Sequence, residues 1–377
     1  MPTASYHNRN RRSPAPHPHS LEGNFFYPKQ LSPQPAALHL KDRSVWRGIS
    51  IGAPFPVTGE VVFTTGMVGY IESITDPSYE GQILVFTYPL IGNYGVPPPA
   101  QWESPRIHVR GVVLSHAAPA FSHWQSSLSF IEWLRQERVP ILARADTRAI
   151  TMRLRAHGSM TGALAIRGRK PALMDPNRED LVAQVTPREV SVIGAGRKRV
   201  ILVDCGAKEN IVRALHARHL TVIRVPYDFD YSHLPHDGVV ISNGPGDPER
   251  CTATIAHLQR AFKRKKPILG ICLGSQIMGL AAGARTYKLK YGHRGQNQPC
   301  RITGSTRCVL TSQNHGYAVR EETLPRTWLT TFTNANDGSV EGIRHRTLPF
   351  FSVQFHPEAH PGPNDTNYLF DDFVRLL

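Results

Sequence analysis

The feature that most restricts the fold of this chain is a Gly-x-Cys-x-Gly pattern, formed by Gly270, Cys272 and Gly274, between two apolar runs. Pro267–Ile271 is typical of a buried strand and Leu273–Ala282 of a helix. Two glycines at this spacing permit a sharp strand-to-helix turn that lifts the middle side chain out of the fold, as in the nucleophile elbow of hydrolases. The first N–H groups of the helix then lie beside the sulfur, favour negative charge there and offer an oxyanion hole. The glycine frame therefore favours a nucleophilic cysteine over a buried structural one.

A candidate base for this nucleophile lies near the end of the chain. The apolar, β-favouring run Phe350–Phe355 ends in His356, Pro357 and Glu358. A histidine at the carboxyl end of a parallel strand faces the same crevice as the elbow, and Glu358 is close enough to hold the imidazole tautomer. Alone, His356 would suit a capped surface position better, because the chain has 18 histidines. Together with Cys272 and Glu358, it predicts a catalytic triad.

Hydrophobic patterns predict two structured halves. The first half is expected to hold strands at Val45–Ile51, Gly59–Thr65 and Gln82–Thr87 and helices at Ser126–Glu137 and Thr147–His157. In the second half, strands at Val200–Val203, Thr221–Val225, Gly238–Ser242 and Pro267–Ile271 alternate with helices at Glu209–His219 and Leu273–Ala282. This alternation indicates a parallel sheet covered on both faces. Shorter β segments are expected after Gly283, and a closing helix at Tyr368–Leu377.

Four segments of the second half carry a resemblance to a known family: Ser242–Pro248, the elbow, Ser312–Tyr317 and Gln354–Glu358. They resemble the class I (triad) glutamine amidotransferases. Further segments are similar to the small, glutamine-hydrolysing subunit of carbamoyl-phosphate synthetase, and these are Gly59–Phe63, Met67–Tyr70, Thr75–Tyr79, Thr87–Gly95 and Asp146–Arg148. The resemblance runs from about Leu40 to Leu377. Asn297–Cys300 and Phe332–Gly338 are most similar to the eukaryotic, pyrimidine-pathway version, which is usually fused to its synthetase.

The resemblance implies an α/β fold class. An N-terminal, mixed β-rich small-subunit domain at 40–187 would be followed by an open, mostly parallel α/β/α amidotransferase domain at 199–377. A linker is expected at 188–198, where glycines and basic residues gather. Residues 1–39 carry seven prolines and one acidic residue, which favours a disordered tail over a regular helix. A mitochondrial targeting segment is the competing interpretation of this basic tail.

The resemblance also implies which residues hydrolyse and bind L-glutamine. Cys272 would attack the side-chain amide, His356 would shuttle the proton, and Glu358 would orient His356. The backbone N–H of Leu273, with Gly244 or a neighbour, would hold the oxyanion. Position by position, the glutamine site would consist of Ser78, Gly244, Gly246, Leu273, Gln276, Asn314, Gly316 and Tyr317. Without the resemblance, Ser78 would count as part of a structural turn, and Gly244–Gly246 as a plain tight turn.

The implied function is that of the glutaminase subunit of carbamoyl-phosphate synthetase. Ammonia would pass to a large subunit or fused synthetase domain, which makes carbamoyl phosphate from bicarbonate and ATP for pyrimidine or arginine synthesis. This chain has no G-x-x-x-x-G-K-[ST] loop, so ATP and Mg²⁺ are expected in the partner, and no cofactor or metal in this chain. An amidotransferase of guanylate or anthranilate synthesis is less compatible with Thr75–Tyr79 and Thr87–Gly95.

One residue departs from the family pattern. Ser275 stands where relatives usually have a histidine, directly after the second glycine of the elbow. That histidine is not the triad base, and Cys272 is retained, so glutaminase chemistry is expected to survive. A glutaminase-impaired regulatory or interaction subunit is the alternative that Ser275 supports.

Composition limits the partners. Lys and Arg number 44 against 29 Asp and Glu, which gives a formal net charge of +15. The basic residues are scattered and are not interleaved with aromatic residues on a reading element. We therefore expect a basic surface or a contact with an acidic partner subunit, and no nucleic acid. Five scattered cysteines suit a reducing compartment, and no apolar run is long enough for a membrane span. A cytoplasmic location follows as the expectation.

Overall fold

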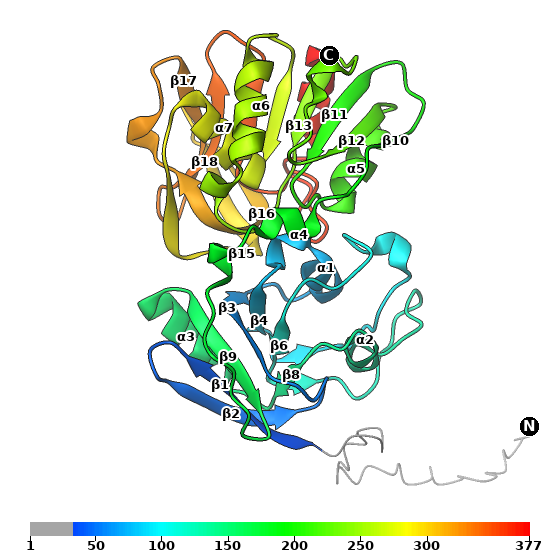
Figure 1. Cartoon of the computed structure of the whole chain (residues 1–377), viewed down its shortest axis with the longest axis vertical. Helices are drawn as coiled ribbons and strands as arrows, with labels where there is room; N and C mark the ends of the chain where they lie inside the picture. The colour runs from blue at the N-terminus through cyan, green and yellow to red at the C-terminus, as the bar shows by residue number, and fades with distance from the viewer. Residues whose placement is uncertain (1–32) are drawn as a thin grey trace, which may run out of the picture.

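The structure is a computed structural model that describes residues 33–377 (Figure 1). It consists of a closed β-barrel followed by a ten-stranded sheet flanked by helices. Most of the tail expected at 1–39 lies outside the described residues. Gln34–Leu40, however, forms strand β1 of the barrel, so a disordered tail up to residue 39 is wrong for this segment. Prolines are compatible with β1 because Pro35 lies at its start, where a missing N–H costs little.

The barrel closes in the order β1-β2-β8-β6-β4-β3-β9. Its strands are β1 Gln34–Leu40, β2 Val45–Ser50, β3 Val57–Thr64, β4 Gln82–Phe86, β6 Gly111–Val113, β8 Ile141–Ala143 and β9 Met160–Ile166. A two-stranded sheet, β5 Leu90–Ile91 and β7 His116–Ala117, lies beside it. The helices are α1 Tyr70–Thr75, α2 Phe130–Gln136, α3 Thr147–His157 and α4 Leu181–Val185. The predicted bounds of α3 match the structure, whereas α2 begins at Phe130, four residues later than expected.

The sheet of the second half has the order β10-β12-β11-β13-β14-β19-β18-β17-β15-β16. Its strands are β10 Ser191–Ile193, β11 Arg199–Asp204, β12 Thr221–Pro226, β13 Gly238–Ile241, β14 Ile268–Ile271, β15 Thr286–Ile302, β16 Cys308–Val319, β17 Trp328–Asn334, β18 Val340–His345 and β19 Phe350–Val353. The central strands β12, β11, β13, β14 and β19 pair in parallel. The other pairs of this sheet are antiparallel.

Helices cover both faces of the parallel strands, which places two cores in this half. Its helices are α5 Glu209–His216, α6 Thr252–Phe262, α7 Leu273–Ala282 and α8 Tyr368–Leu376. Ile201 and Val203 of β11 pack with residues of α6 and α7, whereas Val200 and Leu202 pack with α5 and α8. Because successive strand residues point to opposite faces, a continuous apolar run serves both cores at once.

Two segments differ from the sequence-based expectation. The expected linker 188–198 contains β10, which pairs with β12 and extends the sheet by one edge strand. The β segments after Gly283 are long instead of short, since β15 has 17 residues and β16 has 12. The start of β15 reaches the barrel, where the N–H of Ser159 donates to the carbonyl of Lys290 at 2.9 Å. These long strands therefore connect the two halves (Figure 1).

Among the described residues, no helix combines the length and apolar character that crossing a membrane requires.

Candidate active site

The strand-to-helix turn predicted at Cys272 is present. Cys272 follows β14, precedes α7 and has φ 54° and ψ −105°, a backbone conformation that non-glycine residues rarely adopt. The glycine at position 274 is required by packing, because a Cβ there would lie 2.2 Å from the carbonyl oxygen of Ile241. A Cβ at Gly270 would lie 2.5 Å from the carbonyl oxygen of Gly274. The two glycines thus allow the elbow to pack against its own sheet.

His356 and Glu358 form a buried pair beyond the next strand of the sheet. Because β14 and β19 are parallel neighbours, the residues that follow them meet at one edge, and the N–H of Cys272 donates to the carbonyl of Val353 at 2.9 Å. The Nδ1 atom of His356 lies 2.6 Å from Oε1 of Glu358. Nε2 of His356 has no hydrogen-bond partner among the described residues. The pair therefore fixes one ring nitrogen and leaves the other available.

The electrostatics of this pair favour an imidazolium beside a carboxylate. Burial opposes the charge on His356, but Glu358 and then Cys272 outweigh it and raise the pKa of His356 to about 10. Burial also opposes the charge on Glu358, but Lys208 and His356 lower the pKa of that carboxyl to about 2. Both directions follow from opposite charges held close together out of water.

Lys208 is a functional residue that the sequence reasoning missed. Its Nζ atom lies 3.2 Å from Oε1 of Glu358 and also donates to the carbonyl of Ala359. Lys208 is only 3% exposed. Burial disfavours its charge, yet Glu358, Glu103 and Asp76 raise its pKa. A lysine in the loop before a helix is ordinarily solvated, so nothing in the local sequence indicates that this one is buried.

Beside Cys272 lies a cavity between the barrel and the sheet. It is lined by Glu60, Ser78, Gln82, Asn177, Gly244, Gly246, Cys272, Gln276, Lys288, Arg294, Asn314, His315, Gly316 and Tyr317. The lining thus includes every residue expected to bind glutamine except Leu273, which is buried as the first residue of α7. Glu60, Lys288 and Arg294 add charges that the sequence reasoning did not assign to the site.

The first half of the chain contributes Ser78 to the wall of this cavity, and Asp76 holds the segment that carries Ser78. Asp76 caps the short 3₁₀ helix Pro77–Tyr79 by accepting from the N–H of Ser78 at 2.9 Å. Its other carboxylate oxygen accepts from Nδ2 of Asn314 at 2.9 Å. Ser78 Oγ accepts from Nδ2 of Asn243 at 2.9 Å. These contacts tie the Asp-Pro-Ser-Tyr segment to the turn after β13 and to β16, so its role is more than that of a turn.

Two further polar contacts surround the elbow. Gln276 donates through Nε2 to the carbonyl of Tyr317 at 3.0 Å and to Oε1 of Gln354 at 3.2 Å. Gln354 in turn directs its Nε2 at the sulfur of Cys272 from 3.8 Å. Ser275 is buried, and its hydroxyl lies 2.8 Å from that of Ser352 on β19. Serine at position 275 is therefore accommodated under the elbow by a hydrogen bond to the neighbouring strand.

The mouth of the cavity carries paired charges. Nζ of Lys288 lies 2.6 Å from Oε1 of Glu60. Burial raises the pKa of Glu60, but Lys288 and Arg294 outweigh this effect and lower it. A buried carboxylate next to two cations suits a ligand that itself carries both an ammonium and a carboxylate group. The whole arrangement thus joins a cysteine at an elbow, a histidine–carboxylate pair and a polar cavity.

Comparisons with known proteins agree with this architecture. The family described as "Glutamine amidotransferase class-I" matches residues 201–376, and "Carbamoyl-phosphate synthase small chain, CPSase domain" matches residues 38–164. The multifunctional protein CAD of Squalus acanthias is 48% identical over 354 residues, with 90% of this chain and 16% of that protein covered. The arginine-specific small chain of carbamoyl phosphate synthase from Aspergillus niger is 46% identical over 357 residues, with 90% of this chain and 79% of that protein covered.

The second half of the chain therefore has the fold of a class I glutamine amidotransferase, with the elbow cysteine beside a polar cavity. The chain as a whole belongs to the carbamoyl phosphate synthase small chain family, as the glutamine amidotransferase component of that enzyme. The chain spans only 16% of CAD and 21% of a second fused relative, the multifunctional protein pyr-3 of Neurospora crassa, which is 44% identical to it.

Proposed function

We propose that this chain hydrolyses L-glutamine through Cys272, His356 and Glu358. The thiol proton of Cys272 passes to Nε2 of His356 and forms the imidazolium that Glu358 stabilises, and the sulfur attacks the side-chain amide carbon. His356 returns that proton to the amide nitrogen, the C–N bond breaks, and ammonia leaves a thioester on Cys272. Water then cleaves the thioester to give glutamate and the free thiol. Glu358 holds Nδ1 of His356 throughout, so it orients the base without moving a proton itself.

The observation that carries this proposal is the pairing at His356. Its Nδ1 is held by Glu358 at 2.6 Å, while its buried Nε2 has no partner among the described residues. A buried ring nitrogen without a hydrogen bond is costly unless it serves a function. The neighbouring strand β14 ends at Ile271, directly before Cys272, which is the group that would give up a proton to it.

The oxyanion and the amino-acid end of glutamine have separate supports. The backbone N–H of Leu273, at the start of α7, and that of Gly244 are placed in the roles of oxyanion donors. Gly316 leaves room for the substrate, because a Cβ there would meet only Nη2 of Arg294, at 3.4 Å. Ser78 and Gln276 are assigned to the α-carboxylate and α-amine, with Asn314, Tyr317 and Gly246 closing the cavity.

We further propose that the ammonia passes to a carbamoyl-phosphate synthetase subunit or fused domain. That partner would use ATP and Mg²⁺ to convert bicarbonate and ammonia into carbamoyl phosphate. The relatives' names include both an arginine-specific small chain and multifunctional fused proteins, so the product is assigned to arginine or pyrimidine synthesis. Low glutaminase activity is expected from the chain alone, with a rise when the synthetase binds and shifts the population toward the competent state.

The proposal is tested by a glutaminase assay on Cys272→Ala with its synthetase partner present. Turnover is expected to fall at least about 1000-fold, since the covalent route is lost. The control is Cys308→Ala, because Cys308 is an exposed free cysteine on β16, and this variant is expected to keep full activity. If the wild type releases no ammonia, or if Cys272→Ala matches it, the alternative of a regulatory or interaction subunit takes the place of this proposal.

A further inference from the structure

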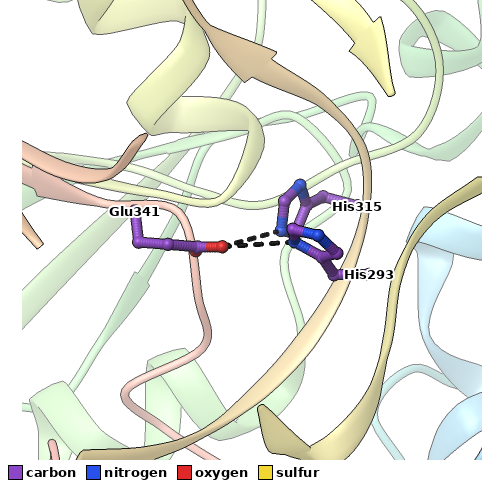
Figure 2. Close-up of side chains that lie close together, drawn as sticks. All are labelled: His293, His315 and Glu341. Atoms are coloured by element: carbon purple, nitrogen blue, oxygen red, sulfur yellow. Dashed lines mark hydrogen bonds and ion pairs between the residues drawn. The ribbon is translucent and has the colours of Figure 1, made fainter. Parts of the chain in front are cut away.

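A second group of buried histidine and carboxylate side chains lies on the antiparallel part of the sheet, outside the assigned triad. It consists of His293 on β15, His315 on β16 and Glu341 on β18 (Figure 2). We refer to it as the histidine cluster. His293 and His315 face each other across the β15–β16 pairing. Figure 2 shows the carboxylate of Glu341 pointing at both rings.

The tautomer of His315 leaves a lone pair directed into this cluster. Nδ1 of His315 lies 2.8 Å from the carbonyl oxygen of Tyr317. A carbonyl can only accept, so Nδ1 must carry the proton and Nε2 of the neutral ring must be unprotonated.

The groups that face this lone pair are acceptors as well. Nε2 of His315 lies 3.3 Å from Oε1 of Gln313 and 3.8 Å from Oε1 of Glu341. The amide of Gln313 is turned this way because its Nε2 donates to Thr311 at 3.0 Å. Oε2 of Glu341 is buried without any hydrogen-bond partner among the described residues. Oxygen and nitrogen lone pairs thus converge on one buried point, which is unfavourable unless a cation lies between them.

We propose that the histidine cluster binds a divalent metal ion of the zinc type through His293, His315 and Glu341. Two histidines and one carboxylate form a known zinc donor set, in which water or a further ligand completes the tetrahedron. Donor atoms at zinc-ligand distances lie about 3.3–3.6 Å apart along the edges of such a tetrahedron. Here Oε1 of Glu341 lies 3.2 Å from Nδ1 of His293 and 3.8 Å from Nε2 of His315.

The residues around the cluster orient these donors as the surroundings of a metal centre do. Nε2 of His293 lies 2.9 Å from Oδ2 of Asp337, so this nitrogen donates outward and Nδ1 faces the cluster. The carbonyl of Tyr317 accepts from Nδ1 of His315, so Nε2 of that ring faces the cluster. Asn334 donates to Oε1 of Glu341 at 3.0 Å. All three proposed ligands therefore have a partner that fixes their direction.

The proposed ion would act as a structural link behind the glutamine cavity. β15 and β17 are paired only at Cys300–Ile302. His293 lies outside this paired part of β15, where Glu341 of β18 contacts both histidines. The carbonyl of Glu341 accepts from the N–H of Gln354 at 2.8 Å, two residues before His356. His315 lies between Asn314 and Gly316 of the cavity wall. Metal bound here would fix the strand segment near His356 and the cavity wall beside His315. The sequence itself predicts no metal.

A proton is the competing occupant. With no cation present, burial opposes the charge on His293, but Asp337 and Glu341 raise its pKa to about 9. An imidazolium at His293 would satisfy one oxygen of Glu341. It would leave the lone pair of His315 facing only the acceptors of Gln313 and Glu341, which is the observation that favours a metal.

The test is a Zn²⁺ titration of the full chain after chelator treatment and dialysis, followed by calorimetry and by the thermal unfolding temperature. One ion per chain is expected, with a rise in Tm. Glu341→Gln is expected to weaken that site about 100-fold or more, and Asp337→Asn about 10-fold. Glu322→Gln is the matched control, because Glu322 is an exposed glutamate whose side chain is 68% exposed. It should bind as the wild type does.

A second readout keeps the proposal testable if Glu341→Gln does not fold. Co²⁺ added to the wild-type chain should give the strong visible absorption of a tetrahedral site at one equivalent. No stoichiometric binding to the wild type would overturn the proposal in favour of the proton. Equal binding by Glu341→Gln and Glu322→Gln would also overturn it, since the ion would then be held elsewhere, for instance by other histidines.

Discussion

The assigned triad and the histidine cluster are two buried histidine–carboxylate groups in one sheet that neutralise their charges differently. In the triad, Oε1 of Glu358 lies 2.6 Å from Nδ1 of His356 and 3.2 Å from the ammonium of Lys208, and its Oε2 has no partner among the described residues. In the histidine cluster, Glu341 has one oxygen facing His293 and His315 and the other without a partner. A lysine thus supplies a permanent cation in the first region, whereas a cation in the second requires a proton on His293 or a bound metal ion.

This difference bears on what each region can do. Buried charges are tolerated when opposite charges and hydrogen bonds offset their desolvation. The triad has both the opposite charges and the hydrogen bonds within the chain. Nε2 of His356 therefore remains free for proton transfer. The cluster has no lysine or arginine among its members and brings three donor atoms together, and this is why we assign it a metal.

The largest loss of activity is expected when His356, the general base of the triad, is replaced. His356→Asn should lower glutamine-dependent turnover about 1000-fold, because the described residues provide no other base at the elbow. Glu358→Gln should be milder, at about 10-fold to 100-fold, since it orients the ring and does not transfer a proton. Steady-state ammonia release with the synthetase present measures both. Equal or reversed losses would remove these roles.

Removing the ammonium of Lys208 should leave the triad without a permanent cation, as in the histidine cluster. Lys208→Met leaves Glu358 buried with less compensation, so the free energy of unfolding should fall by about 3 kcal/mol, and turnover should fall as well. Urea unfolding and the glutaminase assay measure the two effects. Arg375→Met is the control, because it breaks the exposed Arg375–Asp372 pair, where a change within about 0.5 kcal/mol is expected. A loss in Lys208→Met no larger than in the control would contradict the compensation argument.

The dependence of stability on pH reports the same pair. The pKa of Glu358 is about 2 in the folded chain against an ordinary value of 4.5, so its contribution is present above 4.5 and is lost as pH falls toward 2. The pKa of His356 is about 10 against 6.5, so its contribution is present below 6.5 and is lost as pH rises toward 10.

Unfolding free energies measured across pH should separate these two effects. Glu358→Gln should reduce the slope of the unfolding free energy against pH on the acid side by the equivalent of about one proton. His356→Asn should reduce the slope on the alkaline side. If both limbs keep the wild-type slope in both variants, the two groups are not the coupled pair described here.

The smallest effect is expected at Ser275. Ser275→Ala removes one buried hydrogen bond to Ser352, which should cost about 1 kcal/mol of unfolding free energy. Glutaminase turnover should stay within about threefold of the wild type, because Ser275 is not among the residues that line the cavity. A large rise or fall in activity would instead give weight to the regulatory alternative.

Much of the α/β half could be predicted because one pattern controls several features at once. The run Leu273–Ala282 begins and ends where α7 does, since the elbow glycines set its start and Gly283 its end. The strands around it were recognised because buried parallel strands are short apolar runs. By contrast, β1 and β10 are edge or barrel strands with mixed burial, and such strands lack a distinct apolar signature.

The site was predictable only where local sequence carries the chemistry. Cys272 and His356 are marked by glycines and by a strand end, whereas Lys208 and Asp76 act through partners more than 100 residues away in the chain. The histidine cluster has no spacing signature either, because its members come from three different strands. Such contacts depend on strand register and on the docking of the barrel against the sheet, which the sequence pattern does not give.

The central claim is that Cys272 is the nucleophile, and labelling by an electrophilic glutamine analogue tests it most directly. Cys205, Cys251 and Cys300 are buried, and burial raises their pKa values. Cys272 lines the polar cavity. The analogue should therefore modify Cys272 first, as read by peptide mass mapping, and excess L-glutamine should slow that modification. Labelling of Cys205, Cys300 or Cys308 with Cys272 left unmodified would contradict the account.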